Sequence, residues 1–174
     1  MNTIMFESEA WRETLLGHKT YDEFWQAIGP SLGLTSPSSI LCFQKRYQGD
    51  ERLDEEVADI IRGLRGRCKL AVLSNAPPGL SQWLAEWGIL DWFDVVFCSG
   101  DEGLVKPDPR VFHTVLERLD VEPSGAVFVD DTLEHVQAAK GLGIDGLLFS
   151  NARELERELS KFVFRGPSMV DQDG

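Results

Sequence analysis

The chain has 174 residues, of which 17 are lysine or arginine and 29 are aspartate or glutamate, giving a formal net charge of −12 at pH 7. This acidic balance argues against nucleic acid as a partner. The sequence also lacks the apolar run of about eighteen residues that a membrane span needs. A hydrophobic content of 43% is ordinary for a soluble globular protein with one core. The three scattered cysteines show no metal-ligand spacing and favour the reducing cytoplasm.

Residues 1–65 have the mixed polar and apolar pattern of short helices. Residues 11–29 are expected to be helical, and residues 31–39 form a connection rich in glycine, proline and serine. A further amphipathic helix is indicated by apolar side chains at helical spacing, namely Leu53, Val57, Ile60, Ile61 and Leu64. Gly66 is expected to end that helix.

From residue 66 onward, strand-like and helix-like segments alternate. The strands are expected near residues 69–73, 94–98, 126–130 and 146–149. The helices are expected near residues 78–87, 109–119, 133–141 and 152–161. This alternation predicts an α/β fold with a Rossmann-like parallel sheet and helices on both faces. Residues 165–174 are predicted to be a disordered tail.

The first of these strands ends in Ser74, Asn75 and Ala76, followed by Pro77 and Pro78. Prolines suit the first turn of a helix, and a small hydroxyl before a helix can make an anion-binding corner. The Ser74 hydroxyl and the backbone N–H groups from Asn75 onward could hold a phosphate oxygen. The alternative is that Ser74 is an ordinary turn residue.

A lysine lies in a stiff connection before the next helix. Lys106 precedes a proline, which disfavours helical geometry at the lysine. Asp108 and Pro109 are then expected to be the N-cap and first residue of the helix at 109–119. Such a lysine can neutralise a phosphate or a carboxylate, although a lone loop lysine usually faces solvent.

Two adjacent aspartates, Asp130 and Asp131, follow the apolar run of residues 126–129. The end of a parallel strand lies at the edge of the sheet where open α/β folds bind ligands. Paired carboxylates repel each other unless a cation or proton lies between them, so the pair suggests a hard divalent metal such as Mg²⁺. The alternative is that these aspartates merely cap the helix that begins near Leu133.

The order of these three motifs closely resembles the haloacid dehalogenase-like (HAD) superfamily, in the subgroup with a small helical cap. The resemblance runs from about residue 21 to residue 149. It implies that Ser74, together with Asn75, binds the transferred phosphoryl group and that Lys106 steadies it. It also implies that Asp130 and Asp131 hold Mg²⁺.

The chain departs from the family at its N-terminus. Members open with a strand that ends in Asp-x-Asp, whose first aspartate is the nucleophile, and no such motif occurs before residue 60. N-terminal truncation is the favoured interpretation, because a short strand at a free terminus frays. The alternative makes residues 2–6 a remnant first strand and Glu7 the nucleophile. A further departure is His135, where relatives usually carry Asn, and we expect it on a solvated helix face.

The predicted organisation is a helical cap at residues 1–65, a Rossmann-like core at residues 66–164 and the tail. The predicted function is that of a cytoplasmic, Mg-dependent phosphatase of a small phosphate ester, in a chain that lacks the nucleophilic aspartate and is truncated or inactive as written. The alternative is a non-catalytic pseudoenzyme of the same fold that binds a phosphorylated ligand or protein. Because the missing strand is central in the family, unpaired sheet edges predict self-association.

Overall fold

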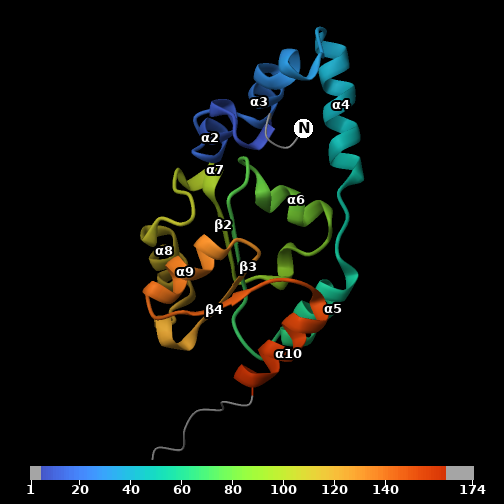
Figure 1. The fold of residues 1–174 in the computed structure, drawn as a ribbon. Coiled ribbons are helices and arrows are strands. Elements are labelled where there is room, and N and C mark those ends of the chain that lie inside the picture. The colour runs from blue at the N-terminus through green and yellow to red at the C-terminus, as the bar shows by residue number, and fades with distance from the viewer. Residues whose placement is uncertain (1–4, 164–174) are drawn as a thin grey trace, which may run out of the picture. The chain divides into compact units, whose positions relative to one another are not determined.

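The computed structural model describes residues 5–163 (Figure 1). Its contacts divide the chain into two compact units, residues 1–122 and residues 123–174, and each unit is described by itself. This division falls at a different place from the expected boundary after residue 65, so the cap and core boundaries stay a prediction. The tail at residues 165–174 lies outside the described residues. No helix within residues 5–163 is both long and apolar enough to cross a membrane.

The first unit begins with helices, as the sequence predicts. Each of the helices α2 to α5 is preceded by a residue whose side chain accepts a backbone hydrogen bond, the usual way of capping a free N–H group. At Thr20 the cap is reciprocal, because Glu23 bonds back to the Thr20 N–H at 2.8 Å. The elements are α2 (Glu9–Leu15), α3 (Tyr21–Ile28), the 3₁₀ helix η1 (Gly29–Leu32), α4 (Pro37–Asp50) and α5 (Glu55–Leu64).

An apolar core holds the helices from α2 to α4 together. Its buried members are Met5, Phe24, Trp25, Ile28 and Ile40. Phe24 and Trp25 are fully buried, and burying a side chain of the size of phenylalanine contributes roughly 1.5–3 kcal/mol. Their rings lie edge to face, with centroids 5.4 Å apart. Packing of this kind, more than helix propensity, keeps such short helices formed.

The remnant strand considered for residues 2–6 is wrong for the two of its residues that are described. Met5 and Phe6 are helical, and Met5 is 1% exposed in the helical core. The apolar side chain of Met5 is therefore buried against α3 and not in a sheet. Residues 2–4 lie outside the described part of the chain. Glu7 follows in an exposed turn.

The rest of the first unit is a parallel α/β layer. Strand β1 (Ala71–Ser74) pairs with β2 (Val95–Cys98), and Ser74 lies opposite Cys98 at the carboxyl end. Helices α6 and α8 cover opposite faces of the pair (Figure 1). The fully buried Phe97 packs against Val111 on α8. The other elements are α6 (Leu80–Glu86), η2 (Leu90–Trp92), α7 (Ser99–Glu102) and α8 (Pro109–Leu119).

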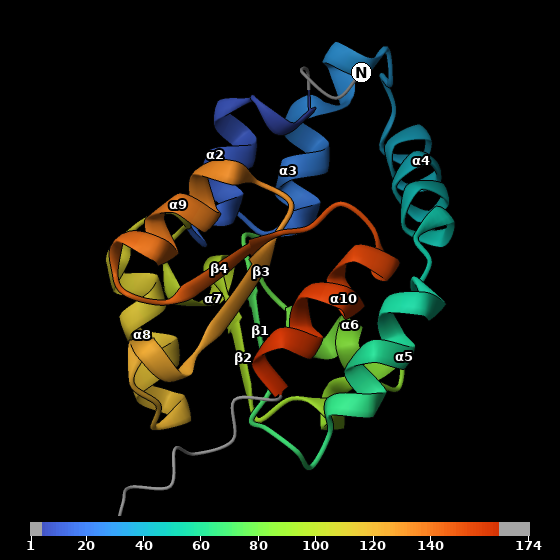
Figure 2. The same cartoon turned by 60° about the horizontal axis from the view of Figure 1, so that its bottom comes forward.

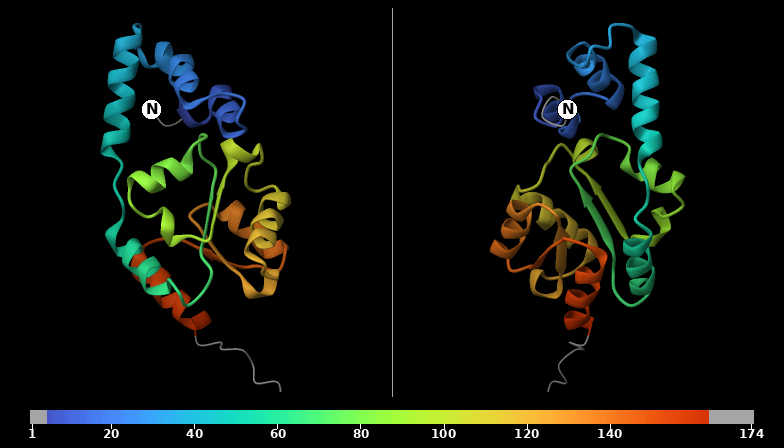
Figure 3. Two further views of the ribbon diagram at one scale, coloured as in Figure 1. Left: turned by 180° about the vertical axis from the view of Figure 1, so that it is seen from behind. Right: turned by 45° about the vertical axis from the view of Figure 1, so that its right-hand side comes forward.

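Helices α2 and α3 lie at the carboxyl end of β1 and β2, with α2 next to α7 (Figures 1 and 3). The contact is close enough to require glycine, because a Cβ on Gly17 would lie 2.3 Å from the carbonyl oxygen of Gly100. Gly17 also has a φ of 74°, which side-chain-bearing residues rarely adopt. The Tyr21 and Trp83 rings add a second contact, with centroids 5.5 Å apart. Helices therefore cover the end of the sheet where Ser74 lies.

The second unit is a smaller parallel layer, which Figure 2 shows from a second side. Strand β3 (Val127–Asp130) pairs with β4 (Asp145–Leu148), and Asp130 lies opposite Leu148. Helix α9 packs on both strands, closely enough at Gly146 that a Cβ there would lie 2.9 Å from Val136 Cγ1. The remaining elements are η3 (Pro123–Gly125), α9 (Leu133–Gly141) and α10 (Ala152–Val163).

All four predicted strands are present, and the α/β fold with parallel pairing is confirmed. The observed strands differ from the expected ranges by one or two residues at their ends. They form two two-stranded sheets, so within the described residues β1 and β3 each have one strand neighbour. Every residue of β1 and β3 is only half-buried, although both strands are apolar.

Candidate active site

Ser74 is the last residue of β1, as expected, and the loop after it runs to Gly79. The expected helix start at Pro78 is wrong, because α6 begins at Leu80 after Gly79. Gly79 has a φ of 97°, and its N–H donates to the Asp101 carboxylate at 3.1 Å. The two prolines therefore stiffen a loop and do not form the first turn of a helix.

A serine that the sequence analysis missed fixes this loop. Ser99 is fully buried at the start of α7. Its hydroxyl lies 3.1 Å from the Ala76 N–H and 3.2 Å from the Ala76 carbonyl oxygen, and can accept from the first and donate to the second. The Gly100 N–H donates to the same carbonyl at 3.1 Å. In the sequence, the contact between Ser99 and Ala76 was indicated only by the run of small residues at the end of β2.

Asn75 holds Lys106 by two hydrogen bonds between the loops that follow β1 and α7. The Asn75 Oδ1 accepts the Lys106 backbone N–H at 2.8 Å, and the Asn75 Nδ2 donates to the Lys106 carbonyl at 3.0 Å. The Lys106 Nζ donates to the Leu73 carbonyl at 3.0 Å. The ammonium group is thereby placed at the carboxyl end of β1, beside Ser74. The side chain of Asn75 serves to position Lys106, and its contact with phosphate stays a prediction.

The helix after Lys106 begins as the sequence predicts. Asp108 is the N-cap of α8 and Pro109 its first residue. The Arg110 Nη2 donates to the Asp108 Oδ2 at 2.6 Å, and this side chain, together with the Arg110 backbone N–H, lowers the pKa of Asp108 to about 2. Asp108 is therefore ionised at neutral pH and fixes the exit of the Lys106 loop.

Removing the Asn75 amide should destabilise the protein. In Asn75→Ala the Lys106 backbone N–H and carbonyl lose their partners in a part-buried loop, and unsatisfied groups of this kind cost about 1–3 kcal/mol. Denaturant unfolding of both proteins measures the difference. Gln82→Ala is the matched control, since this exposed amide bonds only to Glu86 on its own helix and should change stability by less than about 0.5 kcal/mol. Equal effects of the two substitutions would contradict the positioning role.

In the second unit, Asp130 is the last residue of β3 and its side chain is 7% exposed. Its Oδ1 accepts the Thr132 N–H at 2.8 Å and lies 3.1 Å from the His135 Nδ1. Asp131 is exposed, and its Oδ1 accepts the Thr132 hydroxyl at 3.3 Å. The N-cap residue of α9 is Thr132, so neither aspartate is the N-cap, and the simple capping interpretation is wrong.

His135 does not lie on a solvated helix face, and that expectation is wrong. Its side chain is 16% exposed and turned towards Asp130. His135 therefore falls within the candidate site.

The acidic pair is suited to a hard cation. Within residues 5–163 no three His, Cys, Asp or Glu side chains are grouped as metal ligands. Mg²⁺ usually keeps several waters and takes only one or two protein carboxylates together with phosphate oxygens. One buried, hydrogen-bonded carboxylate and one exposed carboxylate at the end of a strand fit this coordination. Asp130 and Asp131 would be the residues that hold it.

The structure thus brings the predicted residues together in two groups. Ser74, Asn75 and Lys106 meet in the first unit, and Asp130 and Asp131 meet in the second, joined there by His135. A single site made of both groups stays a prediction. Glu7 lies in an exposed turn of the helical region, so its part as a nucleophile also stays a prediction.

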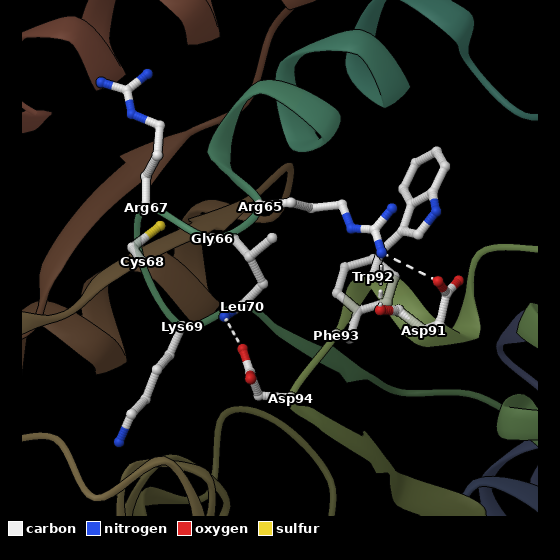
Figure 4. Close-up of a pocket in the computed structure, with 10 residues that line it drawn as sticks. All are labelled: Arg65, Gly66, Arg67, Cys68, Lys69, Leu70, Asp91, Trp92, Phe93 and Asp94. Atoms are coloured by element: carbon white, nitrogen blue, oxygen red, sulfur yellow. Dashed lines mark hydrogen bonds and ion pairs between the residues drawn. The ribbon is translucent and has the colours of Figure 1, made fainter.

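A hollow of about 460 Å³ lies at the other end of the first unit's strands (Figure 4). The Arg65 guanidinium there pairs with Asp91 at 3.0 Å and lies 5.8 Å from the centre of the Trp92 ring. The hollow adjoins the amino ends of β1 and β2, whereas Ser74 ends β1. It is therefore not part of the candidate site. Its lining residues are Arg65, Gly66, Arg67, Cys68, Lys69, Leu70, Asp91, Trp92, Phe93 and Asp94.

Parallel α/β layers can carry a hydroxyl, a lysine and paired aspartates in the segments that follow their strands. This combination is typical of one class of hydrolase. Residues 3–143 match the family model of the haloacid dehalogenase-like hydrolases. The sesquiterpene phosphatase astK of Aspergillus oryzae is 30% identical to the chain over 94% of this chain and 83% of its own length. The chain belongs to the haloacid dehalogenase-like hydrolase family.

Solved structures of this family have the same fold. A HAD family enzyme from Bacteroides thetaiotaomicron, in complex with magnesium, has a TM-score of 0.71 at 22% identity, over 94% of this chain and 86% of that one. A HAD phosphatase from Thermococcus onnurineus has a TM-score of 0.63 at 26% identity, over 87% of this chain and 78% of that one. The resemblance seen in the motifs is thus confirmed by sequence and by fold.

Proposed function

We propose that this chain carries the phosphate-binding and metal-binding parts of a Mg²⁺-dependent phosphomonoesterase. The observation that carries the proposal is the position of Lys106, whose Nζ is held at the Leu73 carbonyl beside Ser74. A cation fixed next to a hydroxyl at the end of a parallel strand matches the charge and hydrogen-bonding needs of a phosphoryl group. Similarity to proteins described as phosphatases supports the same reaction class.

Each residue has a distinct part in this proposal. The Ser74 hydroxyl donates to a phosphoryl oxygen, and Lys106 neutralises charge on the group. Asn75 keeps Lys106 in place through its two hydrogen bonds to the Lys106 backbone. Asp130 and Asp131 would hold Mg²⁺, which, when bound, neutralises phosphate oxygens and orients them. Positioning and electrostatic stabilisation of this kind supply much of the catalysis of phosphoryl transfer.

The chain as given has no residue in the position of the family's nucleophile. No Asp-x-Asp follows an apolar run before residue 60, and the nearest carboxylate considered, Glu7, is in an exposed turn. Charge stabilisation cannot replace a nucleophile, so we propose that this chain binds phosphate and metal but hydrolyses phosphate esters poorly. The second candidate function follows from the same fact, namely a pseudoenzyme that binds a phosphorylated ligand or protein.

The substrate of the site is proposed to be a small phosphate ester with an apolar alcohol. The helices over the carboxyl end of β1 and β2 carry aromatic side chains, among them Trp11 on α2 and Tyr21 on α3, which also pack on the core of the helical region. Tyr21 contacts Trp83 on α6. The similarity to a sesquiterpene phosphatase makes a terpenyl monophosphate the first substrate to test.

Binding of inorganic phosphate tests the proposed function without requiring turnover. We expect calorimetry of the 174-residue chain with phosphate and MgCl₂ to show weak binding, and Lys106→Met to lower the affinity at least about tenfold, since a charge-assisted bond contributes about 1.5–3 kcal/mol. Lys45→Met is the matched control, because Lys45 is exposed on α4. Affinity that is equal in the unsubstituted chain and in Lys106→Met would refute the assignment of Lys106.

A further inference from the structure

His135 joins the candidate metal site from the first turn of α9. The His135 Nδ1 lies 3.1 Å from the Asp130 Oδ1, and both side chains are largely buried, at 16% and 7% exposed. An ionised carboxylate offers only lone pairs, so the ring nitrogen that faces it must carry the hydrogen. The imidazole therefore donates to Asp130. The same oxygen accepts the Thr132 N–H at 2.8 Å.

Two donors on one oxygen fix the plane of the Asp130 carboxylate. The Thr132 bond is local and ties the carboxylate to the start of α9. The His135 bond comes from a side chain in the first turn of the helix, which is 16% exposed. Donors of this kind orient a carboxylate and keep it ionised, and in metal sites their loss typically lowers affinity 10–100-fold.

We propose that His135 is a positioning residue of the metal site. It acts through Asp130, whose carboxylate it holds in the direction needed to face a cation bound at the exposed Asp131. This inference rests on the proposed function, which makes Asp130 and Asp131 the metal-binding residues. It adds His135 to the two aspartates as a residue of the metal site.

The imidazole is not needed to hold α9 in place. The helix is anchored by Val136 and Ala139, which are 1% and 0% exposed. Close packing of Val136 against Gly146 adds to this anchor. Substitution of His135 should therefore leave α9 on the β3–β4 pair, while it removes the donor to Asp130.

The test is a Mn²⁺ titration of the whole chain followed by electron paramagnetic resonance, because Mn²⁺ accepts the same oxygen ligands as Mg²⁺. We expect His135→Leu to weaken Mn²⁺ binding at least about tenfold. We expect His135→Asn to keep most of the affinity, since the side-chain amide nitrogen of Asn can take the place of Nδ1. Asn and Leu are similar in size, so the comparison isolates the donor. His113→Ala, an exposed position on α8, is the control and should bind as the unsubstituted chain does.

The possible results distinguish the positioning role of His135 from the proposed metal site on which that role rests. If the unsubstituted chain binds Mn²⁺ and the Leu and Asn variants bind equally well or equally poorly, the positioning role is overturned while the metal site stands. If Asp131→Ala binds as well as the unsubstituted chain, or if no binding occurs at all, the metal site itself is overturned and the inference falls with it. Circular dichroism of each variant checks that the fold is kept.

Discussion

The 174-residue chain should show almost no Mg²⁺-dependent hydrolysis of p-nitrophenyl phosphate. Ser74, Lys106 and the proposed metal can only stabilise charge and position the phosphoryl group. Loss of a catalytic nucleophile typically lowers the rate by a factor on the order of 10⁴ to 10⁶. Extending the N-terminus with an apolar strand that ends in Asp-x-Asp should recover the rate, and changing the first of those aspartates to Asn should abolish the recovery.

Glu7 provides the control for this prediction. A glutamate could act as a nucleophile in principle, but it lies in an exposed turn outside the β1–β2 pair. We expect Glu7→Gln to leave the residual rate of the unextended chain unchanged. Robust hydrolysis by the unextended chain, lost in Glu7→Gln, would show that Glu7 is a working nucleophile and that our account of the missing group is wrong.

The second large effect we expect is self-association of the unextended chain. Within the described residues, β1 and β3 each pair with one strand and leave an edge of backbone donors and acceptors open. The first three residues of each strand are apolar, and every residue of both strands is half-buried. Open, apolar edges of this kind recruit further strands, and isolated two-stranded sheets are marginally stable. We therefore propose that the unextended chain self-associates as its concentration rises.

Sedimentation velocity over a range of concentrations measures this association. The unextended chain should shift to larger species, and the version with the added strand should stay monomeric. Asp131→Ala in the unextended chain is a control, because it changes the candidate site and not the strand edges. A well-behaved monomer at every concentration would contradict the proposal that open edges drive association.

Local signals in the sequence predicted the elements well. The helix Pro109–Leu119 begins and ends at the expected residues, because Asp108 and Pro109 are strong start signals. The four strands are present within one or two residues of their predicted positions. The start of α6 was misplaced, since prolines that suit a first helical turn here belong to a loop ended by Gly79.

Contacts between distant residues could not be predicted in this way. The two hydrogen bonds between Asn75 and Lys106 join residues 31 positions apart, and the bonds between Ser99 and Ala76 join residues 23 positions apart. Periodicity alone also failed for His135, because which side of α9 is covered depends on how the helix packs on β3 and β4. The pairing of four strands into two separate pairs depends on which strand is available as a neighbour, which no local pattern encodes.

We propose that Ser74 and Lys106 share one site with Asp130 and Asp131. Phosphorus-31 relaxation of inorganic phosphate, measured with the extended chain and Mn²⁺, tests it most directly, because a paramagnetic ion accelerates relaxation only of nuclei close to it. We expect strong relaxation of the bound phosphate. Asp131→Ala, which removes the metal, and Lys106→Met, which removes the phosphate, should each abolish this relaxation. Phosphate and Mn²⁺ that both bind, with phosphorus relaxation no faster than in the absence of the metal, would contradict it.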